Sequence, residues 1–274
     1  MLTAEEYKLS IRKMKVNAYL DGKKVENLLA NPVTRSVVEA TAQIYELAAD
    51  PEHEGIMTAF SHLGDQKINR NLHVNRSTED LERRADMALL TSRTLGTCNY
   101  RCVGCDAINA LASVTFEIDR SKGTEYGRRF NEFLRKAQEM DWTVSGAVTD
   151  AKGDRSKRIL EGDPDMYVHM VEKKSDGIVV RGAKVHQSGA FAAHGTVVIP
   201  GGALRKGEEG YAVAFAVSNS TPGITYILQY PPLSAEREQA EDIYQLGNPQ
   251  FGQRETCLMV FDDVFVPYEN VFLC

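Results

Sequence analysis

Hydrophobic positions follow two different periods along the chain, and the change falls near residue 143. Before it, apolar residues recur every three or four positions, as in amphipathic helices, and after it they alternate in short runs, as in strands. The clearest helix is predicted from Pro32 to a stop at Asp50-Pro51. Further signals predict a helix capped by Thr3 with Glu6, a hairpin over 18–25 around Asp21-Gly22, a helix from Ser77 with Asp80 as far as the Cys98 segment, and a helix over 125–140.

The second region has the pattern of an all-β unit. Its β-branched runs, bounded by turn residues, cover residues 166–171, 177–181, 195–199, 211–217 and 256–261. Residues 174–177, Lys-Ser-Asp-Gly, predict a hairpin turn. We therefore predict an α+β fold with a mostly helical domain over residues 1–142 and a small β-barrel domain over residues 143–274. The chain closes on an apolar run, so we expect it to lead into further structure.

Composition narrows the class of protein. The chain has 274 residues, 43% of them hydrophobic, which suffices for one large core or two smaller ones. The net charge is −6 and the 32 Lys and Arg residues are scattered, which argues against nucleic-acid binding. No stretch approaches about 18 apolar residues, and the N-terminus lacks the pattern of a signal peptide. We expect a cytoplasmic protein without nucleic-acid or membrane partners.

The cysteines are the first candidates for chemistry. They number five, and three of them lie within eight residues, which suits metal or redox chemistry better than disulfides. If the segment is helical, Cys98 and Cys102 stand on one face with Cβ atoms about 6 Å apart, and their thiolates could ligate an iron–sulfur cluster. The simpler alternative is a pair of buried thiols. The spacing of Cys98, Cys102 and Cys105 also matches radical S-adenosylmethionine enzymes, but the strands that follow lack the βα units of such a barrel.

Longer motifs resemble one family. They are Ile68-Asn-Arg70, Leu72-His73, Ser77-Thr-Glu-Asp-Leu81, Arg101-Cys-Val-Gly104, Asp106-Ala-Ile-Asn-Ala110, Thr149-Asp-Ala-Lys-Gly-Asp-Arg155, Asp163-Pro-Asp165, Asp176-Gly-Ile-Val-Val-Arg-Gly-Ala-Lys-Val-His-Gln187 and Phe261-Asp-Asp-Val-Phe-Val-Pro267. On these motifs the chain resembles the FAD-dependent 4-hydroxybutyryl-CoA dehydratase/vinylacetyl-CoA isomerase family. The resemblance implies a fold similar to acyl-CoA dehydrogenases: an N-terminal helical domain, a middle β-barrel domain, and a C-terminal helical bundle that is missing here, with FAD held between them.

The resemblance also implies site residues. Cys98 and Cys102 match two ligands of a [4Fe–4S] cluster, whose other two ligands are expected from the missing bundle. Flavin-binding residues are expected in two polar segments, with Thr149, Asp150, Lys152, Asp154 and Arg155 in one and His186, Gln187 and Ser188 in the other. Without the family, these segments would equally be a solvated turn and a polar strand end. Glu255 matches a glutamate near the active site and is a candidate acid/base group, and Tyr100 lies between the two cluster cysteines.

The activity implied by the resemblance is dehydration of 4-hydroxybutyryl-CoA to crotonyl-CoA together with isomerisation of vinylacetyl-CoA. Removal of the weakly acidic β-hydrogen is beyond an ordinary carboxylate base, so flavin would take one electron from the CoA-activated enolate while the cluster acts as a Lewis acid on the leaving hydroxyl. This chain departs from the family pattern at Tyr100, Cys105 and Ser188, where Gln, Met and Thr are usual. The exact substrate therefore stays open.

Two alternatives remain at this point. An FAD-dependent aromatic hydroxylase, similar to 4-hydroxyphenylacetate 3-monooxygenase, would share the architecture and would need no cluster. A non-catalytic subunit, or a remnant of a split enzyme, would account for the chain end. We expect an acyl-CoA substrate, and either a homo-oligomer or a complex with a chain that carries the C-terminal bundle.

Overall fold

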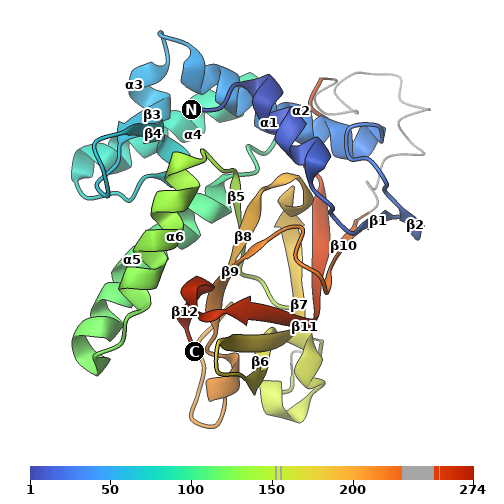
Figure 1. Ribbon diagram of the computed structural model, residues 1–274. Helices are drawn as coiled ribbons and strands as arrows, with labels where there is room; N and C mark the ends of the chain where they lie inside the picture. The colour runs from blue at the N-terminus through green and yellow to red at the C-terminus, as the bar shows by residue number, and fades with distance from the viewer. Residues whose placement is uncertain (152, 155, 230–249, 253) are drawn as a thin grey trace.

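The computed structural model describes residues 1–151, 153–154, 156–229, 250–252 and 254–274, and it places a layer of helices against two β-sheets (Figure 1). The α-helices are α1 (Ala4–Lys13), α2 (Pro32–Ala49), α3 (Glu54–Met57), α4 (Thr78–Leu95), α5 (Cys102–Lys122) and α6 (Tyr126–Glu139). The predicted starts after Thr3, at Pro32 and after Ser77 are confirmed, and Thr3 and Ser77 both form capping boxes. Of the helices that the structure describes, none combines the length and apolarity needed to cross a membrane.

Helix α4 runs as far as Leu95, where the Cys98 segment begins, as predicted. Gly96 takes the left-handed conformation that stops a helix after Leu95. Helix α5, whose bounds the sequence did not reveal, then begins at Cys102 and packs beside α6 (Figure 1). It also approaches the sheet closely, because a Cβ atom at Gly104 would lie 1.9 Å from the carbonyl oxygen of Val144. The backbone of α5 therefore rests directly on a strand.

The strands form two larger sheets and a small one. The six-stranded sheet has the order β2-β1-β10-β11-β7-β6, the four-stranded sheet has the order β12-β9-β8-β5, and β3 pairs with β4. Their bounds are β1 (Ala18–Leu20), β2 (Lys23–Lys24), β3 (Thr58–Phe60), β4 (Lys67–Asn69), β5 (Val144–Ala147), β6 (His169–Lys173), β7 (Gly177–Ser188), β8 (Gly195–Val198), β9 (Ala214–Ser218), β10 (Ile224–Leu228), β11 (Thr256–Pro267) and β12 (Val271–Leu273). The two predicted hairpins are confirmed, since β1–β2 and β6–β7 are antiparallel pairs.

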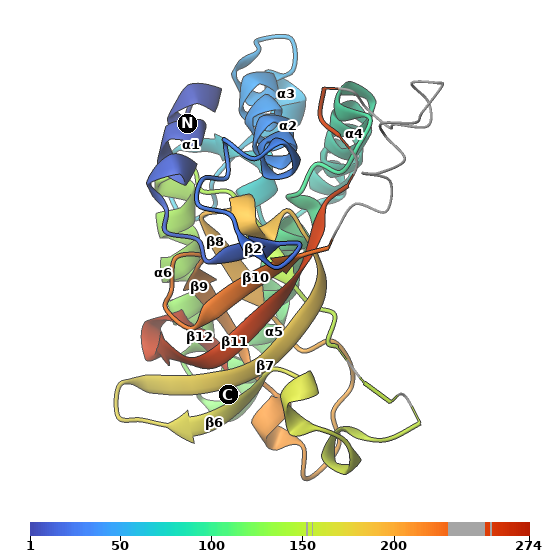
Figure 2. The same ribbon diagram turned by 90° about the vertical axis from the view of Figure 1, so that its right-hand side faces the viewer.

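The predicted β-barrel is wrong for the described part of the chain, where both sheets stay open. Strands β2 and β6 end one sheet, and β12 and β5 end the other. The sheets pack against each other instead (Figure 2), with the ring of Phe215 on β9 centred 5.8 Å from that of Phe261 on β11. Alternating apolar and polar residues occur both in barrel strands and in strands of two packed sheets, so the pattern alone could not separate the two arrangements.

The N-terminal hairpin belongs to the large sheet. Strand β1 pairs in parallel with β10, with Ala18 opposite Tyr226, and Figure 2 shows the hairpin alongside β10. The first predicted region therefore contributes strands to the sheet of the second. The division of the chain into domains at residues 142 and 143 stays a prediction.

Candidate functional site

The Cys98 segment joins α4 to α5 as a loop rather than as part of a helix. The side-chain oxygen of Asn99 accepts the backbone N–H groups of Arg101 and Cys102, at 3.0 and 3.1 Å, and so caps the start of α5. Tyr100 lies in the left-handed region, with a φ of 58°. The helical arrangement considered for the two cysteines is thus wrong, because Cys102 is the first residue of α5 and Cys98 precedes the helix.

Arg101 anchors this loop in the protein core. Its side chain is 1% exposed, although arginine is among the residues least often buried. Its Nη2 donates to the carbonyl oxygen of Trp142 at 3.1 Å, and its guanidinium lies 5.1 Å from the ring centroid of Tyr45. One inward-facing side chain thus fixes the backbone between two cysteines that both keep some exposure to solvent.

The loop brings the two thiols into contact. The hydrogen bond that Cys98 donates lowers the pKa of Cys102 to about 6, and the same bond, together with burial, raises the pKa of Cys98. The backbone N–H of Tyr100 also donates to the Cys98 sulfur at 3.4 Å. The charge of Arg254 further favours the thiolate forms. This pair holds one thiolate and one thiol near neutral pH.

Tyr100 links the thiols to Glu255. Its hydroxyl accepts the backbone N–H of Glu255 at 3.3 Å, and burial raises its pKa to about 12, so the phenol keeps its proton at neutral pH. Glu255 is 3% exposed, and its carbonyl oxygen accepts the N–H of Gly189 at 3.0 Å. A Cβ atom at Gly189 would lie 2.5 Å from the Tyr100 ring, so only glycine allows this approach. The predicted site residues Tyr100 and Glu255, which lie far apart in the sequence, are therefore neighbours in the structure.

A β-bulge shapes the end of β7. Two residues of β7, Val185 and His186, stand opposite the single residue Leu258 of β11, and His186 has a φ of 61°. His186 is exposed, whereas Gln187 is buried and its side-chain amide donates to the carbonyl oxygen of Val185. Ser188 follows, opposite Thr256. The bulge thus turns His186 towards solvent and commits the Gln187 side chain to holding the bulge.

The predicted 149–155 loop divides into buried and exposed parts. Thr149 is exposed, and its carbonyl oxygen accepts the N–H of Val185 at 2.8 Å, which keeps the loop beside β7. Asp150 is buried, and its carboxylate lies 2.6 Å from the ammonium of Lys184. Asp154 is exposed and accepts the N–H and hydroxyl of Ser156. Lys152 and Arg155 lie outside the described residues.

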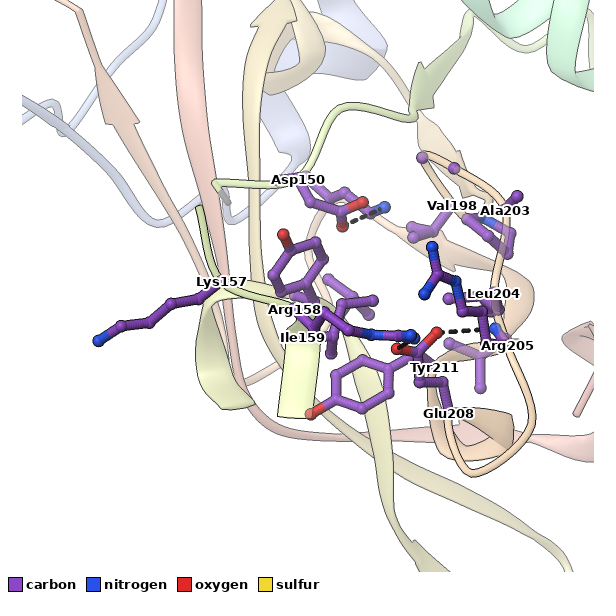
Figure 3. Close-up of a pocket in the computed structure, with 17 residues that line it drawn as sticks. Asp150, Lys157, Arg158, Ile159, Val198, Ala203, Leu204, Arg205, Glu208 and Tyr211 are labelled. Carbon is purple, nitrogen blue, oxygen red and sulfur yellow. Dashed lines mark hydrogen bonds and ion pairs between the residues drawn. The ribbon is translucent and has the colours of Figure 1, made fainter. Parts of the chain in front are cut away.

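A cavity of about 270 Å³ opens beside Asp150, between the loop after β5 and the loop that joins β8 to β9 (Figure 3). Its polar lining includes the Asp150–Lys184 pair, an ion pair between Arg158 and Glu208, and Arg205. Sequence reasoning did not find Arg158, Lys184, Arg205 or Glu208. The ion pair joins residues 50 apart in the chain, and no local spacing signals such a contact.

The structure therefore separates the predicted site into two neighbouring groups. Cys98, Cys102, Tyr100 and Glu255 meet at one end of β7, beside Ser188 and Gly189. Thr149 and Asp150 attach to the same strand at Val185 and Lys184. Strand β7 connects the groups, and His186 lies exposed between them.

Comparison with known proteins gives consistent matches along the whole chain. The model of the family described as 4-hydroxyphenylacetate 3-hydroxylase N terminal matches residues 3–273. The 4-hydroxybutyryl-CoA dehydratase/vinylacetyl-CoA-Δ-isomerase of Clostridium aminobutyricum is 41% identical over 276 residues, which cover 100% of this chain and 56% of that protein. The oxygenase component of 4-hydroxyphenylacetate 3-monooxygenase from Thermus thermophilus is 28% identical, over 99% of this chain and 54% of the relative.

Solved structures agree with these matches. An archaeal 4-hydroxybutyryl-CoA dehydratase from N. maritimus superposes with a TM-score of 0.92 at 36% identity, over 99% of this chain and 54% of that one. A 4-hydroxyphenylacetate 3-monooxygenase oxygenase component in complex with FAD superposes with a TM-score of 0.79 at 25% identity, over 99% and 55% of the two chains. The chain thus spans about half the length of the relatives it matches, and its fold superposes on about half of each solved relative.

Proposed function

Because this chain belongs to the family of 4-hydroxyphenylacetate 3-hydroxylase N-terminal regions, we propose that it forms the flavin- and thiol-bearing half of a 4-hydroxybutyryl-CoA dehydratase. The observation that carries this proposal is the contact between the Cys98 and Cys102 side chains, beside Tyr100 and Glu255. An aromatic hydroxylase would have no use for such a pair. The proposed reaction converts 4-hydroxybutyryl-CoA to crotonyl-CoA and also isomerises vinylacetyl-CoA.

The thiol pair fits one half of a [4Fe–4S] site. Such clusters have four protein ligands, most often thiolates. Cys98 and Cys102 offer two sulfur atoms in contact, and the lowered pKa of Cys102 suits a thiolate ligand. Within the part of the chain that the structure describes, no group of three or more His, Cys, Asp or Glu residues is arranged for a metal. We therefore propose that two further ligands come from a polypeptide that carries the helical bundle.

We propose that FAD binds along the exposed side of the two polar segments. Thr149 and His186 are exposed, and the hydrogen bond from Val185 to Thr149 keeps the segments together. Ser188 and Asp154 would extend the contact surface in either direction, and Lys152 and Arg155, in the same loop, would supply cations for the diphosphate. Asp150 and Gln187 are already bonded to other groups, so their proposed role is to shape this surface.

When bound, the flavin would exchange an electron with the substrate and the cluster would polarise the leaving hydroxyl. The residues of this chain would place the substrate and move its protons. Glu255 is the proposed acid/base group, and its burial would keep bulk water away from the transferred proton. The Tyr100 phenol, protonated at neutral pH, would donate a hydrogen bond close to the thiols.

The test is anaerobic purification of the chain, alone and together with a polypeptide that carries the second half of a relative, followed by an absorption spectrum and iron analysis. We expect flavin in both samples and iron only with the partner. Cys98→Ser and Cys102→Ser should each abolish iron binding. The control variant is Cys274→Ser, which should leave iron binding intact because Cys274 contacts Tyr126 and is not one of the proposed ligands. Iron retained by both site variants would contradict the proposed ligand set.

The second candidate is an aromatic hydroxylase that uses reduced flavin and oxygen. It is favoured by the family model and by the similarity to 4-hydroxyphenylacetate 3-monooxygenase, and it requires flavin but no iron. Flavin without iron in every sample, with hydroxylation of 4-hydroxyphenylacetate when reduced flavin and oxygen are added, would favour this candidate. Neither cofactor in any sample would favour a non-catalytic subunit of a split enzyme.

We further propose that the working enzyme is a homo-oligomer or a complex with the bundle-bearing chain, because half a cluster site is incomplete alone. We expect it to act in the cytoplasm, where thiols stay reduced. Size-exclusion chromatography with light scattering, with and without the partner, measures the oligomeric state. A strictly monomeric chain that holds a complete cluster would contradict it.

A further inference from the structure

The two thiols at the start of α5 are accessible as well as paired. Cys102 is exposed and Cys98 is half-buried, and their side chains share a hydrogen bond. The residues between them are held in place, because Arg101 is buried and Asn99 caps the helix. Formation of a disulfide requires two sulfur atoms at close range and an accessible thiol that can begin the exchange. This pair meets both conditions.

The other three cysteines each lack one of these conditions. Cys105 and Cys257 are only 2% and 0% exposed, so reagents in solution do not reach them. Cys274 keeps some exposure, but it contacts Tyr126. The length of α5, roughly 30 Å at about 1.5 Å per residue, separates Tyr126 from Cys102. Oxidation of the folded chain should therefore select the first two cysteines.

The surroundings of the pair decide which thiol reacts first. Cys102 is the first residue of α5, a helix of 21 residues, and the free backbone N–H groups at a helix start favour a negative charge. Hydrogen bonds from the Cys98 thiol and from the backbone of Val103 also favour its thiolate form. Cys102 is the more exposed of the two as well. It is thus placed to begin an exchange that Cys98 completes.

We propose that Cys98 and Cys102 form a reversible intramolecular disulfide when no cluster occupies them, by exchange with a small disulfide such as oxidised glutathione. The Cys102 thiolate attacks one sulfur of the small disulfide, whose S–S bond breaks to release one thiolate. The Cys98 sulfur then attacks the Cys102 sulfur of this mixed disulfide and releases the second thiolate. Both leaving groups take up the protons that the protein thiols lose. Two protein thiols are thereby oxidised by two electrons, and the small disulfide is reduced to two thiols.

The disulfide would regulate assembly of the proposed cluster, and this part of the inference rests on the proposed function. The ligand of iron is a thiolate, which a disulfide sulfur is not. Oxidation would therefore keep iron out of the site, and it would hold both sulfur atoms in a form that a thiol can restore. Formation of the disulfide itself requires neither iron nor turnover.

The test is alkylation of the reduced, iron-free chain before and after anaerobic incubation with oxidised glutathione, read by mass spectrometry of the denatured protein. We expect the number of thiols open to alkylation to fall by two, from five to three. Peptide mapping should show a bond between Cys98 and Cys102 and no retained glutathione. Dithiothreitol should restore all five thiols.

Three variants separate the steps of the exchange. Cys98→Ser should stop it after the first step, so that Cys102 retains one glutathione. Cys102→Ser should form no internal disulfide and should react much more slowly with glutathione, because the remaining thiol is less exposed. Cys274→Ser is the matched control, since it removes an accessible cysteine outside the pair, and it should still form the disulfide.

The proposal is overturned if all five thiols of the unaltered chain stay open to alkylation, if glutathione stays attached without an internal bond, or if the bond joins another pair. The regulatory role is measured as iron uptake in the presence of the bundle-bearing polypeptide. The oxidised chain should take up no iron until dithiothreitol is added, and uptake equal to that of the reduced chain would refute this role. A chain that forms the disulfide but never takes up iron would support the disulfide and contradict the proposed cluster.

Discussion

Replacement of Arg101 by Met should loosen the loop that holds the two thiols. Met keeps much of the side-chain length, but it removes the hydrogen bond to the Trp142 carbonyl and the contact with the Tyr45 ring. A hydrogen bond from a charged donor contributes about 1.5–3 kcal/mol, and a buried cation–π contact contributes about 2 kcal/mol. Release of the buried charge offsets part of this loss, so we expect the free energy of unfolding to fall by about 2 kcal/mol.

The charge of Arg101 also acts on Asp141. Burial raises the pKa of the Asp141 carboxyl, and Arg101 opposes that rise. Without the guanidinium, the buried carboxyl should take up a proton more readily, and the loss of stability in Arg101→Met should become smaller as the pH falls. Comparison of urea unfolding at two pH values measures this dependence.

Two assays together test the reasoning. Urea unfolding reports the change in stability, and the rate of modification of Cys98 and Cys102 by a thiol reagent reports whether the loop has moved. We expect both to change in Arg101→Met, and we expect Arg101→Lys, which restores a charge but not the planar fork, to be intermediate. If Arg101→Met matches the unaltered chain in unfolding free energy and in thiol modification, the assignment of Arg101 as a positioning residue is refuted.

Three further outcomes follow from buried groups. Lys184→Met should cost about 3–5 kcal/mol by stranding the Asp150 carboxylate, and adding Asp150→Leu should recover the part of the loss in urea unfolding that the carboxylate causes, but not the part from the Val148 and Ile199 carbonyls that Lys184 also contacts. Gly104→Ala should prevent normal packing of α5 on β5, seen as a loss of at least about 3 kcal/mol or as failure to fold, because its Cβ would overlap Val144. Burial lowers the pKa of His194 to about 4, so the stability that comes from the neutral imidazole is complete above about pH 6.5 and is lost as the pH falls towards 4. In unfolding measurements at several pH values, this loss of stability should vanish in His194→Asn. It should persist in the control variant His186→Asn.

Helix starts were predictable because the signals are local. Thr3 with Glu6 and Ser77 with Asp80 lie three residues apart, and each pair satisfies backbone groups at its own helix end. Helix α5 lacks such a signal, because its N-cap, Arg101, makes no side-chain capping bond and the cap comes from Asn99 instead. Its bounds therefore could not be read from spacing.

The sequence motifs supplied candidate residues for the site, but not their geometry. The proximity of Cys98 and Cys102 follows from their short separation, yet a loop rather than a helix creates it. Contact of Glu255 with Tyr100 depends on pairing of β11 with β7, and long-range pairing leaves no trace in local periodicity. The open sheets and the cavity around Arg205 escaped prediction for the same reason.

The parallel pairing of β1 with β10 has a consequence for biosynthesis. Ala18 leaves the ribosome 208 residues before its partner Tyr226, which at about 5–20 residues per second is an interval of roughly 10–40 s. Throughout that time the hairpin can meet nascent chain but not its own sheet. A tag or chaperone that binds the first 25 residues during translation would compete with the pairing of β1 and β10, whereas the same tag on the finished protein would meet β1 already paired.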